Sequence, residues 1–328
     1  MTIRVGMYEG SHAHIRDRLY DLKLDLDVLV FDREGRFDVD GALTAPEEVS
    51  LDYLWLSTHL VADDAQKAAF DVALRLKSLA VLQTFNAGLD NPIYRRIAER
   101  GVRLCNSSAQ GVAIAEYVFA QILSVFHPIE EQRAMQAARE WRVTPFREIS
   151  QTRWVIVGFG PIGRATAARA KAFGAHVTAL RRSTERDPSV DRMGVLDDLP
   201  EVLPEADVIL LACPLTEATR DLAGPAFFEA TKPGAILVNI ARGGVVDDAA
   251  LIAALDAGRL GAAVLDVFRT EPLPADDPLW SHPKVRVTPH TSFAGDGSRG
   301  RWDALFLENI GRYARGEPLI REVDPAEL

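Results

Sequence analysis

The sequence predicts an α/β protein of two domains, each an open parallel sheet flanked by helices. Three observations support this prediction. Short apolar runs alternate with helical stretches along most of the chain. Several runs in the second half are almost continuously apolar, as expected for parallel strands covered on both faces. The length of 328 residues also exceeds what one hydrophobic core usually organises.

The first third of the chain shows this alternation clearly. Apolar runs of strand length predict β-strands over residues 3–7, 28–31, 53–56, 79–82 and 103–106. An amphipathic stretch predicts a helix over residues 65–76, and a longer helix is predicted over residues 111–126. The chain is then mostly polar until an apolar run resumes at Trp154.

A second α/β unit is predicted from Trp154 onward. It begins with a strand over residues 154–157, a glycine turn, a helix over 163–173 and a strand over 175–180. Further strands are predicted over residues 208–211, 235–239, 262–267 and 285–288, with a helix over 248–257 among them.

The C-terminal segment is too short to fold by itself. After Thr288 only about 40 residues remain, too few for an independent domain. We therefore expect a discontinuous domain of residues 1–98 plus 291–328, with a second domain of residues 99–290 inserted into it. A cleft between two such domains is a natural ligand site.

Composition excludes several classes of protein. The net charge of −10 argues against a nucleic-acid partner, which requires a basic face. No apolar run reaches the length of a membrane span, and the N-terminus reads as a strand and not as a secretory signal, so we expect a cytoplasmic protein. Cys105 and Cys213 lack a CxxC partner, so reduced, buried thiols are expected. The seven histidines lack HExxH spacing, and no metal is predicted.

A glycine-rich turn joins the predicted strand over 154–157 to the helix that follows. Its residues are Gly158, Phe159, Gly160, Pro161, Ile162 and Gly163. In a strand–turn–helix context, the first glycine permits the tight turn, the second admits a pyrophosphate to the backbone, and the third allows close packing of helix on strand. The helix N-terminus then presents N–H groups to the phosphates. The motif predicts a Rossmann-type domain that binds a dinucleotide.

The end of the next predicted strand indicates which dinucleotide is bound. NAD-specific domains carry a carboxylate there, which binds the adenosine ribose. This chain has Arg181, Arg182 and Ser183 instead. Arginine forks match phosphate oxygens, so we expect a preference for NADP(H), with NAD(H) as a possible second cofactor. A solvated basic loop is the alternative.

Several ordered motifs now carry a resemblance that covers nearly the whole chain. They are GFGPIG (158–163), ACPLT (212–216), KPGAILVNIARGGVVDDAAL (232–251), LDVFRTEPLP (265–274) and VTPHTS (287–292). The chain resembles the D-isomer-specific 2-hydroxyacid dehydrogenases, most of all the glyoxylate/hydroxypyruvate reductase branch. The resemblance implies hydride transfer between a nicotinamide and a small 2-oxo or D-2-hydroxy acid, and a homodimer.

The same resemblance implies three catalytic residues: Arg242, Glu271 and His290. Each also follows a predicted strand, where open α/β sheets bind their ligands. A guanidinium can hold a 2-oxo acid and polarise its carbonyl, and a histidine beside a carboxylate can donate a proton to the alkoxide. Taken singly, each residue has an ordinary structural reading: a turn anchor, a solvated carboxylate and a satisfied polar group.

Other positions follow from the resemblance. Cofactor contacts are implied at Cys213, Pro214, Thr216, Ile240, Ala241 and Asp266. Substrate contacts are implied at Asn86, Ala87 and Gly88, together with Arg242 and His290. Asp266 has an alternative reading as a turn cap, and the loop at 86–88 as an ordinary glycine turn. The chain departs from the family at Asn86, where small residues such as serine are common, and at Arg269, which is expected to lie apart from the chemistry.

Two other functions stay open from the sequence alone. One is a non-catalytic scaffold that senses dinucleotides, like the corepressors related to this family, although the chain has no long appended segment. The other is a dehydrogenase acting on phosphite, whose cofactor site is similar.

Overall fold

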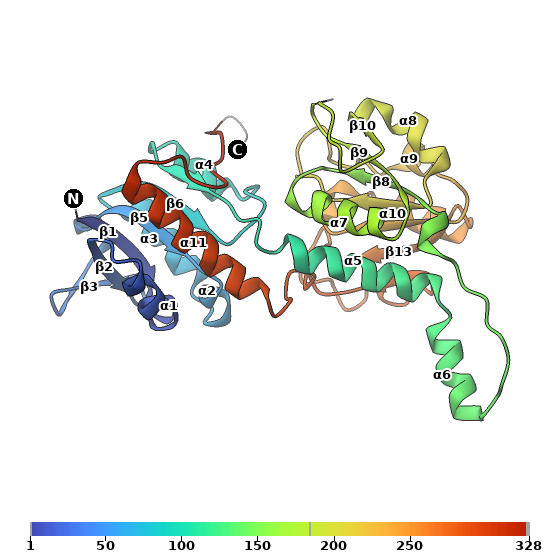
Figure 1. Ribbon diagram of the computed structural model, residues 1–328, viewed down its shortest axis with the longest axis horizontal. Coiled ribbons are helices and arrows are strands. Elements are labelled where there is room, and N and C mark those ends of the chain that lie inside the picture. Colours follow the sequence, from blue (N-terminus) through green and yellow to red (C-terminus); the bar gives the residue numbers. More distant parts are fainter. Residues whose placement is uncertain (1, 184, 326–328) are drawn as a thin grey trace. The chain divides into compact units, whose positions relative to one another are not determined.

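The computed structural model describes residues 2–183 and 185–325. The chain divides into two compact units, Met1–Gln110 with Asp296–Leu328 and Gly111–Gly295. Each unit is a mostly parallel sheet flanked by helices, which confirms the predicted fold class (Figure 1).

The unit boundaries differ from the predicted ones at residues 98 and 290. The first boundary falls after Gln110 because β7 (Arg103–Cys105) pairs in parallel with β6 (Ser78–Thr84) and so extends the first sheet. The second boundary falls after Gly295, since the backbone of Thr291 and Ser292 is bonded to Asp266 in the second unit.

The sheet of the first unit has the strand order β4-β3-β2-β1-β5-β6-β7. Five strands are parallel: β1 (Ile3–Tyr8), β2 (Leu26–Phe31), β5 (Ser50–Leu56), β6 and β7. At one edge β3 (Phe37–Val39) and β4 (Ala42–Thr44) form an antiparallel hairpin on β2. The sequence predicted an open parallel sheet and did not indicate this hairpin, because strands of three residues are too short to show a periodicity.

Helices cover both faces of this sheet. On one face, α1 (Glu9–Asp21) and α11 (Ser298–Arg315) contribute to one core, where Phe306 of α11 stacks on Trp55 of β5 with ring centroids 4.2 Å apart. The other face carries α2 (His59–Ala62), α3 (Gln66–Arg75) and α4 (Pro92–Ala98). The C-terminal helix is therefore part of the same core as the N-terminal strands, because its apolar side finds cover only there.

The sheet of the second unit is parallel throughout, in the order β10-β9-β8-β11-β12-β13-β14. The strands are β8 (Arg153–Val157), β9 (His176–Leu180), β10 (Arg192–Gly194), β11 (Val208–Leu211), β12 (Ala235–Asn239), β13 (Leu260–Leu265) and β14 (Val285–Val287). In chain order this is 3-2-1-4-5-6-7, the dinucleotide-binding arrangement with one added strand. Its switch point lies between β8 and β11, where dinucleotides bind.

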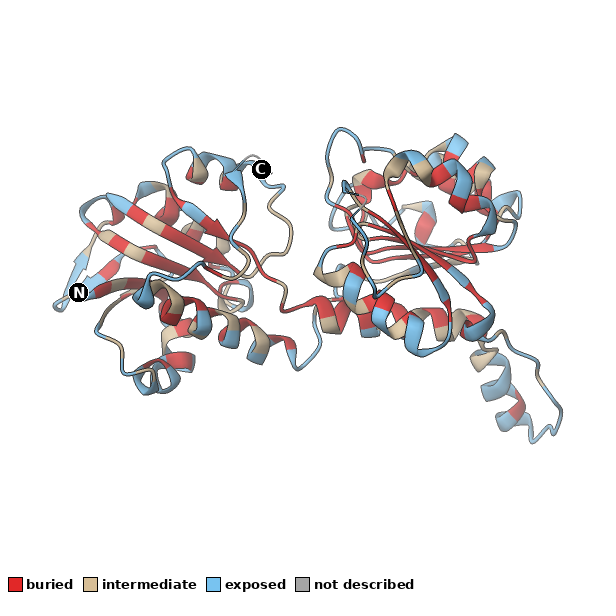
Figure 2. Cartoon of the chain, turned by 45° about the horizontal axis from the view of Figure 1, so that its top comes forward, coloured by how far each residue is buried: buried red, intermediate tan, exposed pale blue. Residues whose placement is uncertain are grey.

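Two helical layers sandwich this sheet, and its strands are buried almost throughout (Figure 2). On one face lie α5 (Gly111–Phe126) and α7 (Pro161–Ala172), where Phe119 stacks on Trp154 at 5.1 Å. On the other face lie α8 (Leu199–Val202), α9 (Pro225–Ala230) and α10 (Asp248–Asp256).

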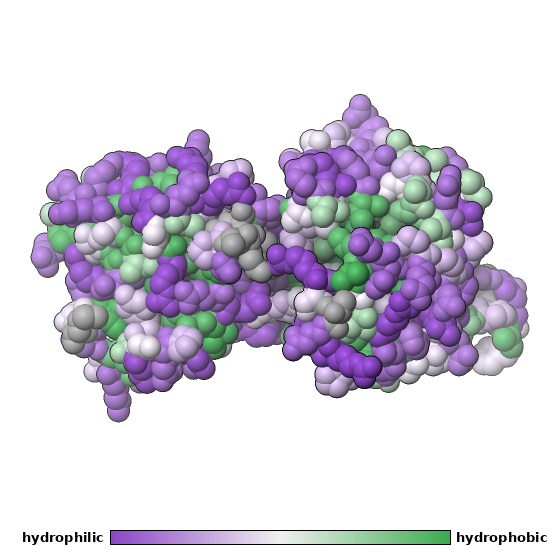
Figure 3. All heavy atoms as spheres, turned by 90° about the horizontal axis from the view of Figure 1, so that it is seen from above, coloured by the Kyte–Doolittle hydropathy of each residue, from purple (hydrophilic) through white to green (hydrophobic). Residues whose placement is uncertain are grey.

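A projecting arm follows α5. It comprises α6 (Ile129–Ala138) and an extended segment in which Trp141 is fully exposed (Figure 1). The sequence predicted only a polar stretch here. In the described residues no single helix is long and apolar enough to cross a membrane; α5 and α6 pass that test only together, and they are bent by 57°. Hydrophilic residues cover much of the surface in Figure 3.

The amino ends of the strands in the second unit are braced by ion pairs. Asp207, just before β11, is buried and accepts bonds from Lys232 Nζ at 2.6 Å and from the Arg153 backbone N–H at 2.8 Å, and Arg147 completes the cluster. Burial alone would raise the pKa of Asp207, but the bonds from Lys232 and Arg153 and the charge of Arg147 lower it overall.

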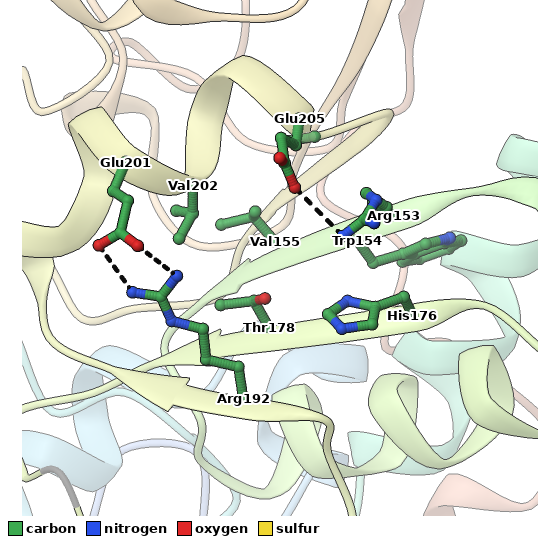
Figure 4. Close-up of a pocket in the computed structure, with 10 residues that line it drawn as sticks. Arg153, Trp154, Val155, His176, Thr178, Arg192, Glu201, Val202 and Glu205 are labelled. Atoms are coloured by element: carbon green, nitrogen blue, oxygen red, sulfur yellow. Dashed lines mark hydrogen bonds and ion pairs between the residues drawn. The ribbon is translucent and has the colours of Figure 1, made fainter.

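A cavity of about 290 Å³ lies at the same edge (Figure 4). Its rim is closed by ion pairs, a bidentate one between Arg192 and Glu201 at 2.8–2.9 Å and another between Arg153 and Glu205 at 3.1 Å. The cavity is lined by Arg153 and His176, the first residues of β8 and β9, whereas dinucleotides bind at the carboxyl ends of such strands. The cavity is therefore not the dinucleotide site predicted from the glycine turn.

We predict that Asp207→Asn lowers the free energy of unfolding at pH 7 by about 2–3 kcal/mol, since it leaves charged partners of a buried group uncompensated. The pKa of Asp207 is lowered in the folded state, so its contribution is complete above the pKa of an unfolded aspartate, near 3.8, and is lost as the pH falls through the lower folded value. Urea unfolding at pH 7 and at pH 3 measures the free energy of unfolding of both proteins.

The exposed ion pair between Arg192 and Glu201 offers a control: Glu201→Gln should change the free energy of unfolding little at either pH. An Asp207 variant as stable as the parent at pH 7 would contradict the brace.

Candidate active site

The glycine turn joins β8 to α7 at the switch point of the second sheet. Gly158 has φ +100°, and a Cβ there would lie 2.5 Å from the backbone of Ala212. A Cβ on Gly163 would lie 2.3 Å from the carbonyl oxygen of Gly158. The fold itself therefore requires glycine at both positions.

Gly160 is different, because a Cβ there would meet no described atom within 4 Å. It precedes Pro161, the first residue of α7, and within the described part of the chain no side chain caps this helix. The helix N-terminus thus keeps open space and backbone donors in front of it. These residues fit a dinucleotide pyrophosphate, which needs open space close to the backbone and N–H donors for its oxygens.

The loop after β9 holds the predicted phosphate-binding arginines. Arg181 turns inward: its Nε donates to the Ser183 carbonyl at 3.1 Å and its Nη2 to the Glu185 carbonyl at 2.8 Å. Arg182 and Ser183 are exposed. The residue following β9 is Arg181 and not the carboxylate expected of an NAD-specific domain. The bonds of the Arg181 side chain to the two carbonyls hold the loop in shape.

The same loop is tied to the start of α7. Arg164 pairs with Asp187 and lies over the ring of Phe159, 4.7 Å from its centroid. Bonds from the Ser189 hydroxyl and N–H, followed by the bond from Arg164, lower the pKa of Asp187 to about 2. The loop is therefore anchored beside the glycine turn.

The other predicted cofactor residues lie at the carboxyl ends of β11 and β12. Cys213 and Pro214 follow β11, and burial raises the pKa of the Cys213 thiol to about 11. The Thr219 hydroxyl donates to the Pro214 carbonyl at 2.7 Å and accepts from the Thr216 N–H at 2.8 Å, which fixes this segment. Ile240 and Ala241 follow β12 and are buried.

Asp266 follows β13 and is completely buried. Its Oδ1 accepts from the Thr288 hydroxyl at 2.7 Å and the Thr291 N–H at 2.9 Å, and its Oδ2 accepts from the Ser292 N–H at 3.0 Å. Its backbone carbonyl accepts from the His290 N–H at 2.8 Å. Asp266 therefore braces the segment that carries His290, a role that the sequence did not predict.

Two further residues missed in the sequence extend this brace. The Tyr117 hydroxyl of α5 lies 2.6 Å from the Thr288 hydroxyl, and burial raises the pKa of Tyr117 to about 12. Because Thr288 donates to Asp266, Tyr117 donates to Thr288. Thr288 and Thr291, which flank Pro289-His290, were the only sequence signal for this brace. Their pattern does not reveal Tyr117, because Tyr117 is distant in sequence.

His290 and Glu271 are brought together as a pair. The His290 Nδ1 lies 2.9 Å from Glu271 Oε2, while Glu271 Oε1 accepts from the Phe268 N–H at 2.9 Å. Facing a carboxylate, Nδ1 is the donor, so Nε2 on the other side of the ring is left to exchange a proton. His290 has φ +49°, a left-handed conformation that is uncommon outside glycine and recurs at functional sites.

Arg242 follows β12 in an extended conformation. Asn239, buried at the end of that strand, donates from Nδ2 to the Arg242 carbonyl at 3.0 Å and accepts from the Ala241 N–H at 3.1 Å. Arg242 Nη1 donates to the Ala241 carbonyl at 2.7 Å. The three residues of the predicted triad thus follow the carboxyl ends of neighbouring strands in one sheet: Arg242 follows β12, Glu271 follows β13 and His290 follows β14.

The predicted substrate residues Asn86, Ala87 and Gly88 lie in the first unit, directly after β6. Asn86 uses its side chain internally, since Oδ1 accepts from the hydroxyls of Thr84 at 3.1 Å and Tyr94 at 3.0 Å. This bonding gives a structural reason for an amide at a position where the family commonly has a small residue.

Comparison with known proteins points to one family. A sequence model of the D-isomer specific 2-hydroxyacid dehydrogenase NAD-binding domain matches residues 119–292, more than half of the 328 residues. The chain is 33% identical over 271 residues to a D-3-phosphoglycerate dehydrogenase of Bacillus subtilis, covering 81% of this chain and 51% of that protein. It is 32% identical over 271 residues to a glyoxylate reductase of Korarchaeum cryptofilum, covering 79% of each. The chain spans about half the length of the phosphoglycerate dehydrogenases it matches.

Solved structures agree over the full length. A D-isomer specific 2-hydroxyacid dehydrogenase family protein from Aeromonas salmonicida has 31% identity and a TM-score of 0.80, over 98% of this chain and 99% of that one. A D-isomer specific 2-hydroxyacid dehydrogenase from Xanthobacter autotrophicus, in complex with NADPH and MES, has 27% identity and a TM-score of 0.78, over 100% and 99%. An NADPH-dependent glyoxylate/hydroxypyruvate reductase from Sinorhizobium meliloti, with NADP and sulfate, has 25% identity and a TM-score of 0.77, over 99% of each chain.

Sequence, sheet order and structural similarity therefore lead to the same conclusion: the chain belongs to the D-isomer specific 2-hydroxyacid dehydrogenase family.

Proposed function

We propose that the chain transfers hydride between NADP(H) and a small 2-oxo acid or D-2-hydroxy acid of the glyoxylate or hydroxypyruvate type. The observation that carries this proposal is the 2.9 Å contact between His290 Nδ1 and Glu271 Oε2, on the same sheet edge as Arg242 and the open space at Gly160. The glyoxylate reductases among the relatives support the substrate class.

Each residue of the proposed triad has a distinct task. The cofactor, when bound, supplies the hydride that reaches the carbonyl carbon. The Arg242 guanidinium binds the substrate carboxylate and carbonyl oxygen and so stabilises the negative charge that develops on that oxygen. His290 donates its Nε2 proton to the oxygen, completing the alcohol, and takes a proton back when the alcohol is oxidised. Glu271 orients the ring through the contact at Nδ1.

Two other predicted features belong to this proposal. Backbone N–H groups of the loop at Asn86, Ala87 and Gly88 are proposed to receive the substrate carboxylate. A homodimer is proposed to form through the second unit, and the exposed apolar side chains of Trp141 and Val143 on the projecting arm support it, since such groups are usually covered in an assembly.

The proposed preference for NADP(H) is assigned to the loop of Arg181, Arg182 and Ser183. Arg181 donates to the carbonyls of Ser183 and Glu185 and so shapes the loop, on which Arg182 is exposed. The structures with bound NADPH or NADP among the relatives support this preference.

We expect kcat/KM to be about tenfold to a hundredfold higher with NADPH than with NADH, because charge-assisted bonds to a 2′-phosphate contribute about 1.5–3 kcal/mol each. Arg182→Ala should reduce that ratio by lowering kcat/KM for NADPH alone. Arg192→Ala is the control: Arg192 lies within β10, its guanidinium is paired with Glu201, and its loss should leave the ratio unchanged. Equal or better use of NADH by the parent protein would exclude the preference.

We expect His290→Gln to lower kcat by about two to four powers of ten, because glutamine cannot supply the proton. The matched control is His282→Gln. His282 also faces a carboxylate, that of Asp256 at 3.3 Å, but it precedes β14 and so lies at the amino ends of the strands, away from His290. Its kcat should stay within about twofold of the parent. A His290 variant with near-normal turnover would remove this residue from the mechanism.

The substrate is tested with a panel of glyoxylate, hydroxypyruvate, D-3-phosphoglycerate and phosphite, each with both cofactors in the appropriate redox state. We expect the highest kcat/KM with glyoxylate or hydroxypyruvate. Turnover of phosphite alone would favour the phosphite-type dehydrogenase, and cofactor binding without turnover of any compound would favour the non-catalytic scaffold.

A further inference from the structure

Two segments that carry the proposed triad lie backbone against backbone. A Cβ on Gly243, the residue after Arg242, would lie only 1.9 Å from the carbonyl carbon of Phe268 and 2.2 Å from the N atom of Arg269. Any side chain at position 243 would therefore separate the segment of Arg242 from the segment of Glu271. The spacing of the two catalytic segments depends on this contact.

A third segment, the turn at Asp221, is fastened to the same place. The Asp221 N–H donates to the Gly244 carbonyl at 2.9 Å, and the Ala223 N–H donates to the Val245 carbonyl at 3.0 Å. Asp221 has φ +51°, a left-handed conformation that aspartate adopts more readily than most non-glycine residues. Its carboxylate is thereby presented to the segment of Glu271.

Arg269 joins all three segments with one side chain. Its Nη2 donates to the Val246 carbonyl and to the Asp221 carboxylate, and its Nε lies 3.5 Å from Asp248 Oδ2. Val246 belongs to the segment of Arg242, and Asp248 begins α10. Arg269 itself lies two residues before Glu271. A planar guanidinium suits this position, because it offers several donors in a fixed arrangement.

Arg269 is surrounded by carboxylates whose charge it offsets. Burial, together with the nearby carboxylates of Asp277, Asp247 and Asp221, raises the pKa of Asp248, and Arg269 opposes this shift. Without Arg269, these carboxylates would repel one another beside the segment of Glu271.

We propose that Arg269 is a positioning residue for the triad: it holds the segments of Arg242 and Glu271 at a fixed spacing, and through Glu271 it holds the ring of His290. The inference rests on the proposed function for its catalytic consequence. The Glu271 carboxylate is held by the Phe268 N–H at 2.9 Å. Arg269 holds the same short segment through its bonds to the Val246 carbonyl and the Asp221 carboxylate. Arg269 is assigned no contact with the reacting atoms. It connects the segment of Arg242, which is proposed to bind the substrate, to the segment of Glu271, which is proposed to orient His290.

The kinetic test compares Arg269→Ala and Arg269→Lys with the parent protein. We expect Arg269→Ala to lower kcat about tenfold to a hundredfold, since a displacement of about 1 Å in a catalytic group has an effect of that size. The KM for NADPH should change less than about twofold, because the glycine turn is untouched. Arg269→Lys should recover part of the loss, since an ammonium keeps the attraction to Asp221 and Asp248 but not the fork.

Arg192→Ala is the matched control. The side chain of Arg192 is 38% exposed and that of Arg269 37%, and both pair with carboxylates of the second unit. Arg192, however, lies on β10, at the other end of the strand order from β13 and β14. Its kcat should stay within about twofold of the parent. A general loss of stability would affect both variants, whereas loss of positioning affects only Arg269→Ala. Thermal unfolding of both variants measures this difference.

A second readout does not require turnover. The His290 Nδ1 proton, held by Glu271, is expected as a downfield NMR resonance in ¹⁵N-histidine-labelled protein, assigned by its loss in His290→Gln. Arg269→Ala should broaden or remove it, and Arg192→Ala should not. If the parent reduces no 2-oxo acid but the resonance still depends on Arg269, the proposed function fails and the positioning role stands. An Arg269→Ala protein with parental kcat and an unchanged resonance would overturn the inference.

Discussion

The buried carboxylate of Asp266 is the interaction on which the candidate active site depends. It has no exposed surface and accepts three bonds, all from the segment of residues 288–292, and its backbone carbonyl accepts a fourth from His290. A buried carboxylate that loses such partners costs far more than a surface one. The segment therefore cannot relax, and His290 is kept in a left-handed conformation that it would otherwise leave at a gain of about 1 kcal/mol or more.

Around the glycine turn, where the cofactor is proposed to bind, the geometry is set by close backbone packing and not by a buried polar group. Glycine is required at 158 and 163 by the close approach of β8, β11 and α7, whereas a Cβ at Gly160 would meet no atom of the described residues within 4 Å. That contrast separates the structural glycines from the one that leaves room for a ligand. The loop of Arg181, anchored through Arg164 and Asp187, borders the same turn.

The part of the second unit that carries the proposed triad shows how three segments acquire one geometry. The proposed triad residues Arg242, Glu271 and His290 follow the carboxyl ends of the parallel strands β12, β13 and β14, and so lie on the same side of the sheet. Strand order alone does not determine the conformation of the segments that carry them. Local contacts supply the remaining precision: Asn239 for Arg242, Asp266 for His290, and the packing of Gly243 on Phe268 for the spacing between Arg242 and Glu271. Glu271 is tied twice, by the Phe268 N–H and by His290.

The sequence by itself determined the α/β class, most strands of both sheets, the glycine turn and the residues that follow β12, β13 and β14, because apolar periodicity and glycine spacing are local signals. Only the tertiary structure decided the β3–β4 hairpin, the projecting arm after α5, the unit boundary after Gln110, and the inward use of Arg181 and Asn86. It also revealed Asp207, Asp266 and Arg269 as braces. Each of these features depends on partners distant in sequence, and no local pattern records which carbonyl or carboxylate a side chain will meet once the strands have assembled.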